Sequence, residues 1–171
     1  MAVWPPIATG CVGRFPGVDV ITSGDLLRER PSELSANIAR SAHPRAYAVF
    51  MDSSVDRLGF ALWENGTLVR SLSLSPGTGI IENIGEPLPL EKDFWAGRHP
   101  LAHAPDCPLP FHPADLGNEV LRVFFGFVRE GPTDAGCFDP EVVTLAALRL
   151  PDHTARSAQL QAAARRMIRI S

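Results

Sequence analysis

The dipeptide Asn65-Gly66 places the strongest local constraint on how this chain folds. It separates two runs rich in apolar and β-branched residues, 58–64 and 67–75. Asn and Gly both accept the positive φ angles that a type I′ turn requires, and this turn has the twist of the strands that it joins. The sequence therefore predicts an antiparallel β-hairpin centred on these two residues.

The two-residue turn also sets the register of the hairpin. Trp63 should face Leu68 across the ladder, and Leu62 should face Val69. Leucines and serines alternate along the second strand, so we expect its leucine face to be buried and its serine face to be open. The leucines are Leu68, Leu72 and Leu74, and the serines are Ser71, Ser73 and Ser75.

Apolar periodicity predicts further strands and helices on both sides of the hairpin. A third strand precedes it at Tyr47–Asp52, and the clearest helix follows at Pro113–Val128, with its apolar residues on one face. The shorter predicted elements are a strand at Val18–Thr22, a helical turn at Asp25–Glu29, a helix at Ser32–Ala42, a strand at Val142–Leu150 and a helix at Thr154–Ile170.

Residues 1–17 are expected to form an irregular leader, because they contain three prolines and three glycines, and Ile7–Val12 is the only candidate strand there. The whole chain, 1–171, is expected to be a single α+β domain that ends in a helical, basic tail at 151–171. Its core is predicted to be a mainly antiparallel sheet of about five strands with the helix at 113–128 packed on it.

Composition narrows the class of protein. With 45% hydrophobic and 20% charged residues, the chain has the composition of a soluble globular protein. Its net charge of −3 provides no general attraction to nucleic acid or to an anionic membrane. The three cysteines include no CxxC pair, which predicts free thiols in a reducing cytoplasm. No run of about 18 apolar residues and no cofactor motif occurs, so we expect a cytoplasmic protein without a cofactor.

The stretch 71–100 carries the densest set of chemically capable side chains. One interpretation is a small-molecule-binding or protein-interaction domain whose site lies along this stretch. Another is that the same side chains hydrogen-bond the loop backbone and hold an irregular segment rigid. The candidate ligand contacts are Ser73, Ser75, Asn83, Asp93 and Trp95.

A hydrolase is the alternative function. Glu82 or Glu86 would act as the general base, with His99 or His112 as the acid, because neighbouring titratable groups can divide these roles when burial separates their pKa values. This function requires a carboxylate and a histidine to lie within hydrogen-bond reach of one shared concave space.

Two other groups of residues give weaker signals. His99, His103, Cys107 and His112 are metal-ligand types, but prolines extend this segment and the spacing matches no established zinc pattern, so no metal site is predicted. The segment 52–56 joins two strands and begins with an aspartate, a superficial similarity to the first hairpin of actin-like and ribonuclease-H-like phosphotransfer folds. It lacks the Gly-rich run of a phosphate loop, and ordinary turn chemistry explains its Asp and Ser residues.

A resemblance to a known family rests on three runs of sequence. The runs are GRFPGVDVITSGDLLRERPSEL at 13–34, ALWENGTLVRSLSLSPGTGIIENIGEPLPLEKDFWAGRHP at 61–100 and PLPFHPADLGNEVLRVFFGFVREG at 108–131. Together they resemble a family of uncharacterised actinobacterial proteins that is defined by a domain of unknown function. The resemblance implies a bacterial cytoplasmic protein and supplies no activity, cofactor or catalytic residue.

The resemblance also bears on assembly. Relatives carry a further strand and helix before the FPG segment, whereas a short Pro-rich leader precedes it here. A missing strand would leave a sheet edge exposed, and pairing with a second chain would cover that edge. We therefore predict a homo-oligomer, most simply a dimer.

Overall fold

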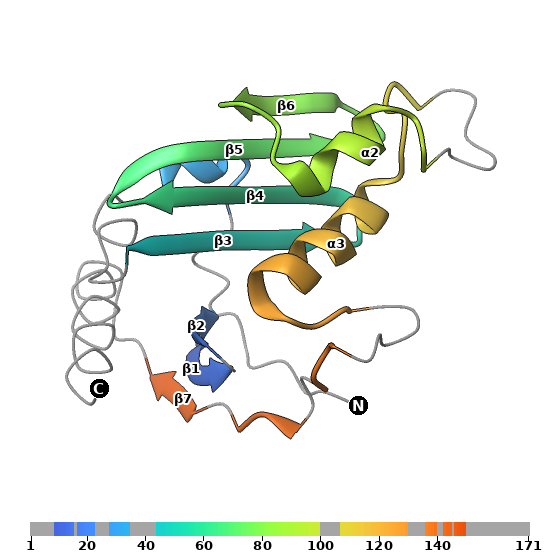
Figure 1. Ribbon diagram of the computed structural model, residues 1–171. Coiled ribbons are helices and arrows are strands. Elements are labelled where there is room, and N and C mark those ends of the chain that lie inside the picture. The colour runs from blue at the N-terminus through green and yellow to red at the C-terminus, as the bar shows by residue number, and fades with distance from the viewer. Residues whose placement is uncertain are drawn as a thin grey trace.

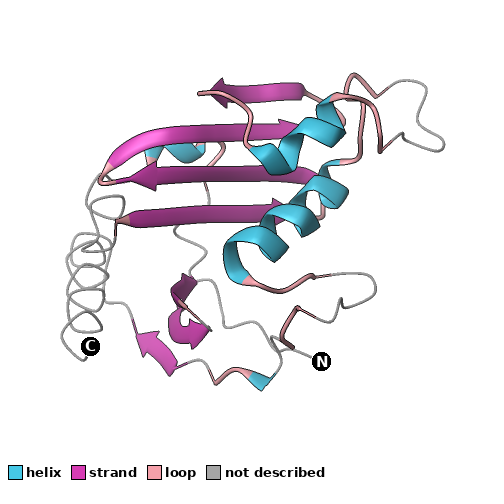
Figure 2. Cartoon of the chain, in the orientation of Figure 1, coloured by secondary structure: helices cyan, strands magenta, loops and turns pink. Residues whose placement is uncertain are grey.

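Two antiparallel sheets form the framework of the protein (Figures 1 and 2). The computed structural model describes residues 9–15, 17–22, 28–34, 44–99, 107–129, 136–139, 142–144 and 146–149. The larger sheet has the strand order β3-β4-β5-β6, and the smaller has the order β2-β1-β7. The α+β class is therefore confirmed, whereas a single sheet of five strands is wrong, because β1 pairs with β2 and β7 in a separate sheet and not with the hairpin.

The elements of the larger sheet follow one another along the chain. Its strands are β3 (Arg45–Asp52), β4 (Arg57–Glu64), β5 (Thr67–Ser75) and β6 (Gly79–Ile84). The smaller sheet contains β1 (Thr9–Phe15), β2 (Val18–Thr22) and β7 (Ala146–Arg149). The helical elements are two 3-10 turns, η2 (Pro31–Glu33) and η3 (Pro89–Glu91), and two α-helices, α2 (Lys92–Trp95) and α3 (Pro113–Phe125).

The predicted hairpin forms, with one change of register. Asn65 and Gly66 have φ angles of 50° and 77°, as a type I′ turn requires. Trp63 pairs with Leu68 as predicted, but Leu62 pairs with Arg70, and this pairing corrects the predicted partner Val69. A β-bulge causes the shift, because Val69 is an extra residue on β5.

The bulge divides the side chains of β5 between the two faces of the sheet. Leu72 and Leu74 pack with Leu58 and Phe60 on the face that carries α2 and α3. Leu68 instead packs with Trp63 in a second cluster, so the prediction that all three leucines share one face is wrong. A one-residue insertion exchanges the faces of every residue beyond it.

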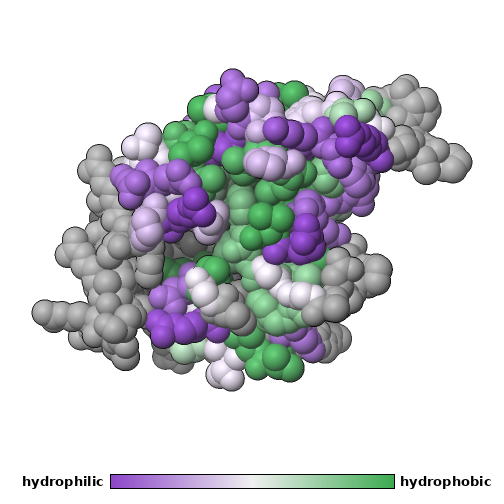
Figure 3. Space-filling view, in the orientation of Figure 1, coloured by the Kyte–Doolittle hydropathy of each residue, from purple (hydrophilic) through white to green (hydrophobic). Residues whose placement is uncertain are grey.

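The serine face is covered and not open. Ser71, Ser73 and Ser75 are buried, because η2 contacts β4 and β5 on this side of the sheet. Figure 1 shows α2 and α3 in front of the larger sheet and the blue helical turn of η2 behind it. The surface on the side of α2 and α3 is a mosaic of hydrophilic and hydrophobic residues (Figure 3).

Strand β6 occupies part of the stretch that the sequence predicts as loop. It pairs with β5 along its length and contains a second register shift, opposite Ser73 and Leu74. Gly85 ends the strand with a φ of 79°, and a Cβ atom added there would lie 2.0 Å from the carbonyl oxygen of Val69. Only glycine fits this position. Gly85 therefore lets the chain turn directly after β6 while its backbone stays close to β5.

Helix α3 begins where predicted and ends three residues earlier. Pro113 is its first residue, and Gly126 stops it at Phe125 by adopting a φ of 78° and donating its N–H to the carbonyl of Arg122. Gly117 brings the helix close to β3, because an added Cβ would lie 2.7 Å from Met51 Cε.

Two predictions for the N-terminal part of the chain change, and two others are not tested. The irregular leader contains β1, which pairs with both β2 and β7. The helix predicted from Ser32 does not begin there, since η2 is followed by Leu34 with a ψ of 134°, and residues 35–43 lie outside the described residues. The predicted turn at 25–29 and the helical tail at 151–171 lie largely or wholly outside them. Among the described residues, no helix is both long and apolar enough to cross a lipid bilayer.

Candidate binding site

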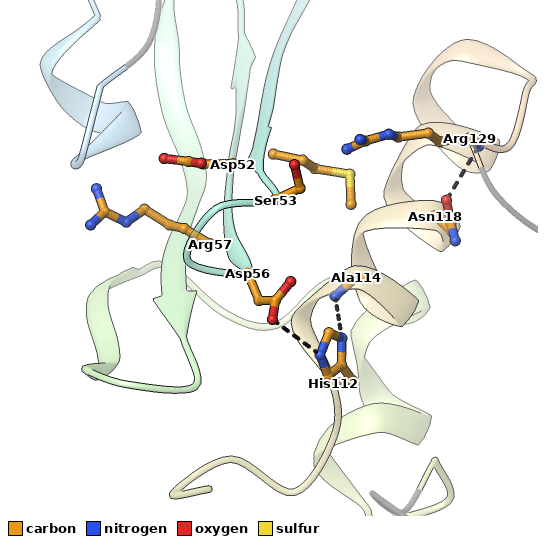
Figure 4. Close-up of a pocket in the computed structure, with 9 residues that line it drawn as sticks. Asp52, Ser53, Asp56, Arg57, His112, Ala114, Asn118 and Arg129 are labelled. Atoms are coloured by element: carbon orange, nitrogen blue, oxygen red, sulfur yellow. Dashed lines mark hydrogen bonds and ion pairs between the residues drawn. The ribbon is translucent and has the colours of Figure 1, made fainter.

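A cavity of about 150 Å³ lies between the turn that joins β3 to β4 and the first part of α3 (Figure 4). Its walls come from three separate segments of the chain, and most of the lining side chains are polar or charged. The lining residues are Met51, Asp52, Ser53, Asp56, Arg57, His112, Ala114, Asn118 and Arg129.

The β3–β4 turn is held by its own first residue. One carboxylate oxygen of Asp52 accepts hydrogen bonds from the backbone N–H of Ser54 at 3.0 Å and from its hydroxyl at 2.6 Å. These two bonds, the hydroxyl first, lower the pKa of Asp52, so this carboxyl is ionised at neutral pH. Asp56, at the end of the turn, has a φ of 47°, a conformation that Asp and Asn tolerate better than most residues.

His112 links the turn to the helix. Its Nδ1 accepts the backbone N–H of Ala114 at 3.2 Å and so caps α3. A ring nitrogen that accepts a hydrogen bond carries no proton, so in the neutral ring the proton is on Nε2. Nε2 lies 3.8 Å from Oδ2 of Asp56, and both side chains border the same side of the cavity. That separation exceeds a direct hydrogen bond.

The other side of the cavity is formed beyond the first turn of α3. Asn118 accepts the backbone N–H of Arg129 at 3.2 Å, which fixes the segment after the helix against its side. In Figure 4, Asp56 and His112 border one side of the cavity, Asn118 and Arg129 the other, and the side chains of Asp52 and Arg57 extend away from the helix. The cavity thus has a carboxylate and a guanidinium on different walls.

The general-base candidates of the sequence lie elsewhere. Glu82 is buried and accepts hydrogen bonds from the backbone N–H and hydroxyl of Ser32, at 3.1 and 2.6 Å, and from the hydroxyl of Ser71. It shares the serine face with Ser71, opposite the face that carries α3 and His112. Its role in the structure is to attach η2 to the sheet.

The other members of the predicted hydrolase set are not brought together. Glu86 is exposed in the loop after β6. His99 is exposed and stacks on Phe94, with ring centroids 4.0 Å apart and planes 13° from parallel. Among the described residues, neither Glu82 nor Glu86 contacts His99 or His112, and the carboxylate that faces His112 is Asp56.

The predicted ligand contacts are also divided. Ser73 and Ser75 lie on the serine face, Ser75 hydrogen-bonded to Thr78 at 2.5 Å, while Asn83 points to the other face and accepts from Arg70. The remaining two are residues of α2: Asp93 pairs with Arg98 at 2.7 Å, and Trp95 donates Nε1 to Glu91 at 3.1 Å. The structure does not bring these five residues to one opening.

A buried ion pair that the sequence interpretation missed holds the stretch 71–100 together. Arg70 and Glu91 are both 0% exposed and form two parallel hydrogen bonds of 2.8 and 2.7 Å. Arg70 also donates to Asn83 at 2.6 Å and to the carbonyls of Ile84 and Gly85 at 3.0 and 3.2 Å. An arginine two positions before Leu72, in line with the leucines of the alternating strand, was the available signal. These contacts support the rigid interpretation of this stretch.

No group of three or more His, Cys, Asp or Glu side chains in the described part of the chain is arranged to hold a metal ion. His103, one of the four metal-ligand types noted in the sequence, lies outside that part. Cys11, Cys107 and Cys137 are free thiols, as predicted.

Comparison with known proteins identifies the family. The model of a family of unknown function, DUF6928, matches residues 1–148. The chain belongs to the DUF6928 family. The predicted membership of a family without known function is therefore confirmed, and the actinobacterial source stays a prediction. Neither a curated protein nor a solved structure matches the chain. The function of this DUF6928 protein must therefore be inferred from the geometry of its site.

Proposed function

We propose that the protein binds a small polar ligand in the cavity between the β3–β4 turn and α3. The observation that carries the proposal is the opposition of Asp56 and Arg129 on different walls of one cavity. Ligand sites combine a concave space with a few fixed polar groups that set the orientation of the bound molecule. The β3–β4 turn provides Asp56, α3 provides Asn118, and the segment after α3 provides Arg129.

The size of the cavity limits the ligand. Its volume is about 150 Å³. Sites for drug-sized molecules typically measure about 300 to 1,000 Å³, so the ligand is smaller than these. An amino acid or a short organic acid has the appropriate size.

The charges favour a ligand that carries both signs. An ammonium group would lie near Asp56, and a carboxylate would lie near Arg129 and Asn118 on the opposite wall, because opposite charges attract. His112 would contribute the donor on Nε2 beside Asp56. An amino acid supplies the ammonium and the carboxylate, and a hydroxyl on the same molecule would accept the hydrogen bond from Nε2.

Binding is better supported than hydrolysis. A histidine that activates a nucleophile uses one ring nitrogen for the nucleophile and the other for an orienting group. In this protein the backbone N–H of Ala114 occupies Nδ1 and Asp56 faces Nε2, so no ring nitrogen is directed at a nucleophile. Glu82 lies on the opposite face of the sheet from His112.

A thermal-shift screen tests the proposal. The compounds are amino acids and short organic acids, including hydroxy acids. A ligand present at a hundred times its Kd stabilises the folded state by about 2.7 kcal/mol, which raises Tm by roughly 5 to 10 °C for a chain of this size. The shift should disappear in Asp56→Asn, since Asn keeps the side-chain shape and tolerates the positive φ at this position.

The matched control is Asp93→Asn, which removes the α2 carboxylate of the exposed ion pair with Arg98. This variant should keep the full ligand-induced shift. A shift that survives Asp56→Asn and is lost in Asp93→Asn would move the binding site to the 71–100 stretch, and a panel without any hit would contradict the proposal.

A further inference from the structure

The outer edge of β6 is a second surface with the properties of an interaction site. β6 is the last strand of the larger sheet, and in the part of the chain that the structure describes no strand lies beyond it (Figure 1). An edge strand presents backbone N–H and C=O groups that can pair with another strand. Natural proteins usually protect such edges with charged side chains, proline or a covering element.

β6 carries no exposed charged side chain and no proline. Its sequence is GIIENI, and its only charged residue, Glu82, is buried and hydrogen-bonded to Ser32 and Ser71. Two large apolar side chains are instead exposed, Ile80 at 48% and Ile84 at 43%. The strand therefore offers an uncharged, partly apolar edge.

The two isoleucines lie on different faces of the sheet. Ile80 pairs with Leu74, which belongs to the face that carries α2 and α3, whereas Ile84 pairs with Ser71 on the serine face. A strand added at this edge would meet apolar surface on both sides of the new ladder. Such flanking contacts supplement the backbone hydrogen bonds when a sheet is extended.

The edge is also held in place before any partner binds. Arg70 donates to the carbonyls of Ile84 and Gly85 at 3.0 and 3.2 Å, and Glu91 fixes Arg70 through two hydrogen bonds. A strand that is already ordered loses little conformational freedom on pairing, so less of the interaction energy is spent on ordering it.

We infer that β6 pairs antiparallel with β6 of a second copy of this chain, which joins the two larger sheets into one sheet of eight strands. A second copy fits because identical strands related by a two-fold axis run antiparallel and bury the same surface on each subunit. The absence of an exposed charge on β6 lets two copies of it approach without repulsion between like charges. The other edge of the sheet, β3, is less suited, since it begins at the exposed Arg45–Glu64 ion pair.

Light scattering coupled to size-exclusion chromatography, over a hundredfold range of concentration, tests this inference. The full chain should show the mass of two chains at high concentration. Ile84→Lys and Ile80→Lys place a charge at the edge and should each raise the dimer dissociation constant at least about tenfold. Val123→Lys is the matched control, because Val123 is 49% exposed on α3 and should leave dimerisation unchanged. Far-UV circular dichroism confirms that each variant is folded.

Hydrogen exchange of the unmodified chain provides a second measurement that needs no variant. Amides of β6 should become more protected as the protein concentration rises, while those of β3 should not change. A mass of one chain at the highest concentration would overturn the inference. So would a dimer that Val123→Lys weakens as much as Ile84→Lys, or one in which the protected amides belong to β3.

Discussion

The change Glu91→Gln should destabilise the protein more than any conservative substitution on its surface. Each carboxylate oxygen of Glu91 accepts two hydrogen bonds: Oε1 from Arg70 Nε and the Leu88 N–H, both at 2.8 Å, and Oε2 from Arg70 Nη2 at 2.7 Å and Trp95 Nε1 at 3.1 Å. A glutamine keeps only one oxygen. Its NH₂ group would therefore face two donors, and Arg70 would remain buried without a charged partner.

The expected magnitude follows from this burial. Removing one partner of a fully buried ion pair typically costs about 3–5 kcal/mol, a large part of a total folding free energy of about 5–15 kcal/mol. For a chain of this length such a loss lowers Tm by roughly 6 to 20 °C. Urea unfolding followed by circular dichroism measures the free energy of unfolding directly.

Two comparison variants show whether the ion pair is the cause. Asp93→Asn breaks the exposed pair with Arg98 and should cost no more than about 1 kcal/mol. In an Arg70→Met background Glu91→Gln should cost less than in the natural chain, because no guanidinium is left unpaired. A loss below about 1 kcal/mol for Glu91→Gln alone would refute the assignment of Arg70 and Glu91 as the pair that holds this region.

Two further predictions concern the backbone and pH. Gly85→Ala should lower the free energy of unfolding, measured in urea, by at least about 1–3 kcal/mol. Gly85 has a φ of 79°, and an added Cβ would lie 2.0 Å from the Val69 carbonyl oxygen. An unchanged urea midpoint would contradict this prediction. The Ser54 hydrogen bonds hold the pKa of Asp52 below its ordinary value of 3.8, so they contribute stability that is present above this pH and is lost as pH falls through the lowered pKa. Thermal unfolding in acid should therefore depend less on pH in Asp52→Asn, and parallel pH profiles for the two proteins would count against it.

The sequence predicted those parts of the fold that local residues determine. The Asn65-Gly66 turn, the strands on each side of it and the start of α3 at Pro113 follow from residues within a few positions of one another. The bulge at Val69 does not, because regular alternation continues through it in the sequence. Its consequence, the assignment of Leu68 to the opposite face, could therefore not be predicted from periodicity.

The candidate site was only partly predictable for a related reason. His112 was identified as a chemically capable residue, but its neighbour in space is Asp56 and not Glu82. Asp56 lies 56 residues before His112 in the sequence. It belongs to a turn whose Asp and Ser residues are already explained by ordinary turn chemistry. The pairing depends on how closely α3 approaches β3, which Gly117 allows. Likewise, Arg70 and Glu91 are separated by 21 positions, and no local pattern connects them.

The location of the ligand site is the central claim, and chemical-shift mapping tests it most directly. Backbone and indole N–H resonances would be followed by NMR while the best hit of the screen is added. We predict that the perturbed residues are those of the turn at 52–57, the start of α3 at 112–118 and Arg129, with Trp95 Nε1 unchanged. Perturbations confined to Trp95 and the residues of 71–100 would contradict this site.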